Sequence, residues 1–204
     1  MTTTHNIIIQ RLEESPFSYS DVAVILHKAF EERVKQGIIM SPSKMTAADF
    51  KEKGDTRIVL VAIIDNKLAG TAMTQLRVDQ DGIPYGYEEF KGVLPIYKRK
   101  GIGSILEDNL QKIAIDSGMS YLISTTAVRA RSSIKFHQSK GFFKWCLVSY
   151  PDTGYYSVVL RKQLRHDKKW DNILYRKFHY LLSFCQTVLN KRRDGNKRRW
   201  RRWF

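Results

Sequence analysis

The segment from Gly92 to Ser104, GVLPIYKRKGIGS, limits the fold of this chain more than any other feature. An apolar run ends at Pro95, which donates no main-chain hydrogen bond and turns the chain. Three adjacent cations and two glycines follow, and beyond them apolar residues recur at the spacing of a helix. A strand, a tight turn and a helix in this order are typical of α/β folds, in which the helix packs on the sheet.

Other apolar runs and helical repeats continue this pattern through residue 161. Strands are expected at residues 7–12, 57–64, 68–78, 87–94, 121–126, 142–150 and 155–161. Helices are expected between residues 20 and 37, at 46–53, after the glycine turn, and at 132–140. The order βααβββαβαββ predicts a mixed central sheet with helices on both faces.

The glycine turn predicts a site for an anion. Gly101 and Gly103 let the main chain bend tightly and approach a ligand, and the amides of the next helix point outward at its positive end. The cations at residues 98–100 add contacts to phosphate, so a pyrophosphate suits the turn. It is not a Walker A loop, because GxxxxGK[ST] is absent, and Leu106 stands where a dinucleotide-binding loop has its third glycine.

Two motifs in this chain resemble those of the GNAT superfamily of acyl-CoA-dependent N-acyltransferases. Lys98-x-x-Gly101-x-Gly103 is similar to the family's [RQ]xxGx[GA], between a strand and a helix. The stretch Ala130–Phe142 corresponds to the family's N-x-x-A-x-x-[FL]-Y-x-K-x-G-F. The resemblance covers residues 7–161 and implies a GNAT-like fold, acetyl-CoA as co-substrate and no metal.

The resemblance also implies a set of residues that hold acetyl-CoA. In the family a main-chain amide at the end of the fourth strand holds the oxyanion of the tetrahedral intermediate, which here means the amide near Val93 or Leu94. The first two helices and their loop form the wall for the acceptor, here Phe30 to Thr46. The residues expected to bind the co-substrate are Val93, Leu94, Lys98, Arg99, Lys100, Gly101, Ile102, Gly103, Ser104 and Phe136.

Both motifs depart from the family pattern, the second at the position where the chemistry lies. Lys98, Ala130 and Ser133 replace the family's Arg or Gln, its Asn and its Ala. His137 replaces a Tyr whose hydroxyl, in many members, protonates the departing CoA thiolate. An imidazolium can do the same work, so His137 is a candidate general acid, although a histidine that is merely packed or solvated fits the pattern too.

The base that accepts the amine proton is often a Glu on the fourth strand of the family. Tyr87 occupies its usual place, and Glu88 and Glu89 follow it. Strand alternation puts Glu89 on the same face as Val93 and Glu88 on the opposite face. A bulge would shift that parity. Both carboxylates are candidate bases, with Glu89 preferred, and either would also suit a solvated strand.

The positive charge is concentrated in the last part of the chain. The formal net charge is +15, from 35 Lys and Arg against 20 Asp and Glu. Residues 161–204 account for +12 of it, and the first 160 residues for +3. The main domain is therefore nearly balanced, and we do not expect it to bind nucleic acid.

Two parts are predicted: a GNAT-like acetyltransferase domain over residues 1–163 and a basic amphipathic C-terminal extension over residues 164–204. Residues 167–190 carry apolar side chains at helical spacing, and Lys197–Phe204 alternates cations with aromatics. This pattern favours an anchor of residues 167–204 in the plane of an anionic membrane. Alternatively, the apolar stripe would pack on the enzyme or form a homodimer. The last residues, which alternate cations with aromatics, would also suit binding of RNA or DNA.

Taken together, the sequence predicts a cytoplasmic, metal-free transferase, peripheral on the inner face of a membrane. Its expected reaction moves an acetyl group from acetyl-CoA to a primary amine of a small molecule, such as an amino sugar or glycan precursor. No leader or transmembrane run is seen, and two cysteines and five scattered histidines make no disulfide framework or metal motif. The alternative is a non-catalytic protein that binds CoA or interacts through its basic tail.

Overall fold

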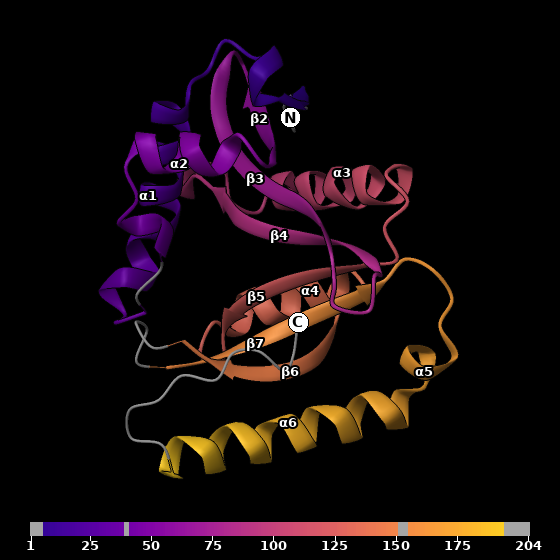
Figure 1. The fold of residues 1–204 in the computed structure, drawn as a ribbon. Coiled ribbons are helices and arrows are strands. Elements are labelled where there is room, and N and C mark those ends of the chain that lie inside the picture. The colour runs from indigo at the N-terminus through magenta and orange to yellow at the C-terminus, as the bar shows by residue number, and fades with distance from the viewer. Residues whose placement is uncertain (1–5, 39–40, 151–154, 194–204) are drawn as a thin grey trace. The chain divides into compact units, whose positions relative to one another are not determined.

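The computed structural model describes residues 6–38, 41–150 and 155–193. Its seven strands are hydrogen-bonded in the order β1-β2-β3-β4-β5-β7-β6, which confirms the expected mixed sheet flanked by helices (Figure 1). The chain divides into two compact units. The first comprises Met1–Leu76 and Glu88–Asp116, and the second comprises Arg77–Tyr87 and Ser117–Phe204. Strand β4 (Pro84–Val93) begins in the second unit and ends in the first.

The first unit is built on β1 (Ile7–Arg11), β2 (Ile58–Ile64) and β3 (Lys67–Val78), which pair antiparallel in sequence order. Almost every residue of β2 is buried, as expected for a strand covered on both faces. Helices α1 (Tyr19–Lys35) and α2 (Ala47–Gly54) pack on one face.

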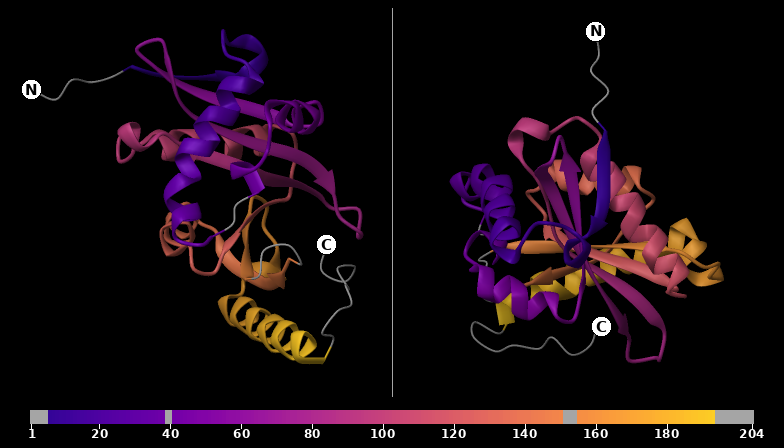
Figure 2. Two further views of the ribbon diagram at one scale, coloured as in Figure 1. Left: turned by 90° about the vertical axis from the view of Figure 1, so that its left-hand side faces the viewer. Right: turned by 90° about the horizontal axis from the view of Figure 1, so that it is seen from above.

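Helix α3 (Ile102–Asp116) packs on the other face of these strands, through Ile102, Leu106 and Leu110 (Figure 2, right). The two helices of the first face begin at capping boxes. Ser18 and Asp21 satisfy each other's main-chain amides at the start of α1, and Thr46 and Asp49 do the same for α2.

The second unit has an aromatic core with a cation inside it. Strands β5 (Tyr121–Ala127), β7 (Tyr156–Gln163) and β6 (Phe143–Ser149) pair antiparallel in that order, and α4 (Arg131–Ser139) links β5 to β6. The Arg161 guanidinium lies 3.7 Å from the ring centre of Tyr121 and 4.5 Å from that of Trp170. Burial lowers the pKa of Arg161 to about 10, and the aromatic faces offset part of the lost hydration.

The C-terminal helices cover the edge of the sheet. Helix α5 (Lys168–Asp171) brings Trp170 into the aromatic core, and α6 (Ile173–Arg193) lies along β6, the last strand of the order (Figures 1 and 2). Polar side chains attach α6 to the main chain of that strand. Ser183 Oγ accepts from the Leu147 amide at 3.1 Å, Thr187 Oγ1 donates to the Leu147 carbonyl at 2.9 Å, and His179 Nδ1 donates to the Trp145 carbonyl at 2.9 Å.

The apolar stripe expected in this region does not cover the domain. Of its members, Trp170 is buried, whereas most of the apolar side chains of α6 are exposed. Among the described residues of the stripe, Trp170 packs in the aromatic core, whereas the side chains of α6 that hydrogen-bond to β6 are polar. The basic and aromatic segment Lys197–Phe204 lies outside the described residues.

The hydrogen bonds of Ser183 should hold α6 in place. Ser183 is 1% exposed, so Ser183→Ala leaves the buried Leu147 amide without this acceptor. We expect the change to lower the free energy of unfolding by about 1–3 kcal/mol, measured by urea denaturation. Gln186→Ala, at an exposed position of the same helix, is the matched control and should leave the midpoint unchanged. Equal midpoints for the two variants would contradict the attachment.

Candidate active site

The turn between β4 and α3 has the conformation that the sequence predicts for an anion site. A 3-10 turn at Pro95–Tyr97 follows β4, and α3 begins at Ile102, whose side chain is buried. Ile105 donates to the Gly101 carbonyl at 3.0 Å, which closes the first turn of the helix. The amides before Ile105 are therefore at the positive end of α3, without carbonyl partners within the helix.

Of the two glycines, Gly101 is the one whose main chain requires glycine. Its φ is +80°, and a Cβ there would meet no atom within 4 Å, so the requirement comes from backbone conformation and not from space. Gly103 lies inside α3 and has no positive φ. The expectation that both glycines make the bend is therefore corrected to Gly101, with Arg99 at φ +63° beside it.

The predicted cations surround this turn on the exposed side. Lys98, Arg99 and Lys100 are exposed, while Gly103 and Ser104 are half-buried. The Lys98 ammonium lies 3.6 Å from a Glu32 carboxylate oxygen, and the Lys100 ammonium lies 5.6 Å from the Tyr97 ring centre. These weak, exposed contacts leave the side chains able to turn toward a phosphate at little cost.

The two amides considered for the oxyanion differ in their bonding. The Leu94 amide donates to the Ala69 carbonyl at 2.9 Å. A donor engaged in this way is not available to a ligand, so Leu94 does not supply the oxyanion contact through its amide. Of the two positions the sequence predicts, Val93 is the remaining one.

Strand β4 changes the direction of its side chains at Phe90. This residue has φ +47°, which interrupts the regular alternation of the strand. Before it, Glu88 is directed toward α3, and after it Lys91 and Val93 are on that same side. Glu89 and Phe90 are both directed toward α1 and α2. The parity expected from plain alternation is therefore wrong, and Glu88, not Glu89, shares the face of Val93.

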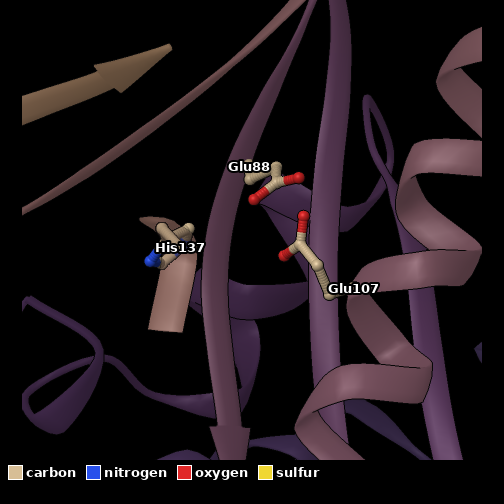
Figure 3. A group of neighbouring side chains, drawn as sticks. All are labelled: Glu88, Glu107 and His137. Atoms are coloured by element: carbon tan, nitrogen blue, oxygen red, sulfur yellow. The ribbon is translucent and has the colours of Figure 1, made fainter. Parts of the chain in front are cut away.

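Glu88 belongs to a buried group of charges. Its side chain is 1% exposed, and the Lys91 ammonium lies 3.3 Å from its Oε2. The same ammonium is paired with Oε2 of Glu107, a residue of α3 whose side chain is fully buried. Gln111 donates to Glu107 Oε1 at 2.7 Å. Figure 3 shows the carboxylates of Glu88 and Glu107 directed toward each other.

This group of three has more negative than positive charge when all its members are ionised. Two carboxylates in one buried place repel each other, and a proton taken up by either relieves the repulsion. Of the two carboxylates, Glu88 lies on the strand that ends at Val93, so it is the candidate base.

Glu89 is held in a different arrangement. Its carboxylate is paired with the Arg57 guanidinium, which also donates to the Lys53 carbonyl of α2 at 2.8 Å. Both side chains are largely buried. This ion pair lies on the side of β4 that is directed toward α1 and α2, opposite the face of Val93. The structure therefore favours a structural role for Glu89.

His137 is buried near the end of α4, where Figure 3 draws it. Its Nδ1 lies 2.8 Å from the Ser133 carbonyl. A carbonyl only accepts, so Nδ1 carries a proton and Nε2 is the nitrogen that can exchange one. The imidazole meets the rings of Phe136 and Phe142 edge to face, with centres 5.4 and 5.2 Å away. These contacts fix the ring.

The remaining predicted residues lie on the expected elements. Phe136 is half-buried on α4. In the expected acceptor segment, α1 ends at Lys35, and Glu31 is paired with Lys35 at 2.7 Å on the exposed side of the helix. Residues 39–40, which include Met40, lie outside the described residues.

Sequence reasoning missed Lys91, Glu107 and Arg57. Glu107 had a signal, because it lies three residues before Leu110 and seven before Ala114, both on the buried side of α3. A charged residue in that position needs a buried partner. Lys91 and Arg57 had none, since each is an ordinary cation near a strand.

The comparisons with known proteins agree with this geometry. A family model described as acetyltransferase (GNAT) family matches residues 24–142, more than half of the chain. No curated protein sequence matches. The chain is similar in fold to three solved bacterial structures at 16–17% identity.

The first is an acetyltransferase from Streptococcus agalactiae, with 16% identity, a TM-score of 0.60, and coverage of 78% of this chain and 98% of that one. The second is the ribosomal-protein-S18-alanine N-acetyltransferase from Escherichia coli. It has 17% identity and a TM-score of 0.58, and the match covers 80% of this chain and 97% of that one.

The third is a GNAT family acetyltransferase from Elizabethkingia anophelis with acetyl-CoA bound. It has 17% identity and a TM-score of 0.58, and the match covers 78% of this chain and 99% of that one. The family match, the strand order and the glycine turn before α3 agree, and this chain belongs to the acetyltransferase (GNAT) family.

Proposed function

We propose that this protein transfers an acetyl group from acetyl-CoA to a primary amine of a small molecule, such as an amino sugar or a glycan precursor. The observation that carries the proposal is the turn before α3, where Gly101 has a left-handed conformation at the positive end of the helix. Three exposed cations adjoin it. Main-chain amides and cations in this arrangement suit the pyrophosphate of acetyl-CoA.

In the proposed reaction the amine attacks the thioester carbon directly. A nitrogen–carbon bond forms, the carbon–sulfur bond breaks, and the electron pair of that bond leaves on the CoA sulfur. The amine loses one proton, which Glu88 accepts, and the thiolate gains one. The Val93 amide holds the oxyanion of the intermediate. Glu88 is assigned in place of Glu89 because Glu88 shares the face of Val93, whereas Glu89 is paired with Arg57 on the opposite side of the strand.

We assign the proton on sulfur to His137. Its Nδ1 is engaged with the Ser133 carbonyl, so the proton leaves from Nε2 of the imidazolium. The ring replaces the tyrosine that serves this purpose in many members of the family. A cation there also attracts the developing thiolate, which a neutral hydroxyl does less strongly.

We further propose that residues 1–163 form the acetyltransferase domain and residues 164–204 an extension that places it at a membrane. A cytoplasmic location suits two free cysteines, Cys146 and Cys185. The competing proposal is a protein that binds CoA without turning it over. Release of CoA in the presence of any amine excludes that alternative, whereas CoA binding alone does not.

Loss of the glycine turn should abolish binding of acetyl-CoA. In a Gly101→Asp, Gly103→Asp variant a carboxylate repels the pyrophosphate, and the left-handed residue is strained. Calorimetric titration should show micromolar affinity for wild type and at least about a hundredfold loss for the variant.

Gly82→Asp is the control, because Gly82 has φ +77° and equally open surroundings. Circular dichroism checks the fold of each variant. If Gly101→Asp, Gly103→Asp binds as tightly as Gly82→Asp, the assignment of the pyrophosphate site is wrong.

Replacing the two adjacent glutamates should separate catalysis from structure. We expect Glu88→Gln to lower kcat by roughly 10²-fold or more with the Kd for acetyl-CoA unchanged, because the base is lost. Glu89→Gln should keep most of kcat and lower the unfolding midpoint, because Arg57 loses its ionised partner. CoA release with a panel of primary amines measures the rates. The reverse pattern would return the base to Glu89.

Removing the imidazole should change the pH dependence of turnover. With His137 as acid, kcat of wild type falls as pH rises and the imidazolium loses its proton. His137→Phe keeps the ring contacts with Phe136 and Phe142, so we expect a folded enzyme with a kcat reduced about 10²-fold and without that alkaline decline. His166→Phe, at an exposed position, should match wild type. An unchanged pH profile in His137→Phe would exclude the assignment.

A further inference from the structure

Helix α6 has its polar side against the protein and its apolar side outward. The side chains of His179, Ser183 and Thr187 hydrogen-bond to the main chain of β6, and they are spaced four apart and so share one side of the helix. Burial lowers the pKa of His179, so its ring remains neutral there. This is the opposite of a surface helix of a globular domain, which buries its apolar stripe.

The outward side carries large apolar groups in one continuous row. Leu174 is 76% exposed, Phe178 and Leu181 are each 59% exposed, and Leu182 is 43% exposed. Their spacing of four, three and one residues places them together, and the exposed Cys185 continues the row. A contiguous apolar patch of this kind on a folded domain marks an interaction surface. We call these five residues the outer face of α6.

The charge on α6 indicates which partner this face meets. From Ile173 to Arg193 the helix contains Arg176, Lys177 and the run Lys191–Arg193, and no Asp or Glu. Arg176 is directed inward, 4.1 Å from the Phe143 ring centre, whereas Lys177 is exposed beside the outer face. A second copy would bring two basic helices together without acidic partners, so charge disfavours a dimer through this face and favours an anionic surface.

We propose that the outer face of α6 lies in the headgroup and acyl boundary of an anionic lipid bilayer, with the helix parallel to the membrane plane. A helix of this length is about 31 Å long, and the edge strand β6 holds it by its polar side. The apolar row enters the bilayer, while the exposed Lys177 contacts anionic headgroups. Among the described helices none is long and apolar enough to cross a membrane.

The two cysteines allow a direct test with the full chain. Cys185 is exposed within the outer face, whereas burial raises the pKa of Cys146 to about 12. A thiol-reactive, environment-sensitive fluorophore should therefore label Cys185 selectively. We expect a blue shift and increased emission with vesicles containing about one part phosphatidylserine to two parts phosphatidylcholine, and no change with phosphatidylcholine alone.

Substitutions on the outer face separate insertion from simple charge attraction. In flotation with the same vesicles, Phe178→Gln, Leu181→Gln should reduce binding at least about tenfold, because two large apolar groups no longer enter the bilayer. Val24→Gln, Ile115→Gln is the matched control, since both side chains are exposed elsewhere in the protein, and it should float like wild type. Circular dichroism verifies that both variants remain folded.

Three results would overturn the proposal. Equal flotation of Phe178→Gln, Leu181→Gln and wild type would mean that charge attraction by other basic residues, such as those at 197–202, suffices. Equal binding to phosphatidylcholine alone would remove the requirement for anionic lipid. Failure of wild type to float, with a dimer in sedimentation that Phe178→Gln, Leu181→Gln dissociates, would assign the outer face to a second copy.

Discussion

The left-handed conformation of Phe90 is the local feature on which the candidate chemistry of the first unit depends. A residue with a Cβ costs about 1–2 kcal/mol in this region of φ and ψ, so the packing around it must offset that cost. The Phe90 ring meets Phe50 edge to face at 5.6 Å, and Phe50 is fully buried. That contact stabilises the irregular conformation of Phe90. Without it, Glu88 and Lys91 would be directed to opposite faces of the strand.

Because Glu88 and Lys91 share a face, both lie beside the buried Glu107, and the burial of that carboxylate explains why a cation is needed there. Glu107 lies among the apolar residues of α3, where an isolated carboxylate would be strongly disfavoured. Lys91 supplies the compensating charge, and Glu88 then makes the group negative. A structural ion pair would need only one carboxylate. The second makes this group different from the pair of Glu89 with Arg57, in which one guanidinium meets one carboxylate.

The order of strands and helices could be predicted because it depends on repeating patterns. Apolar runs of strand length and the glycine turn at residues 98–104 each carry their own local signal. The directions of the Glu88 and Glu89 side chains could not be predicted, because they depend on the positive φ of Phe90, which no residue near it indicates in the sequence. Asn and Gly are the usual residues at positive φ, and here a phenylalanine occupies it through a tertiary contact.

The orientation of helix α6 could not be predicted from its sequence pattern either. Its apolar stripe was visible in the sequence, but amphipathic periodicity does not say which side meets the protein. The side is decided by the polar series His179, Ser183 and Thr187, which is spaced four apart and lies on the side of the helix opposite the apolar row.

An edge strand explains why the polar series determines the side that docks. The outward carbonyls and amides of β6 need partners, and hydroxyl and imidazole groups provide them where leucine cannot. Satisfying the edge therefore commits the polar side of α6 inward. The apolar side is left outward as a consequence, which suits an apolar, anionic surface better than water.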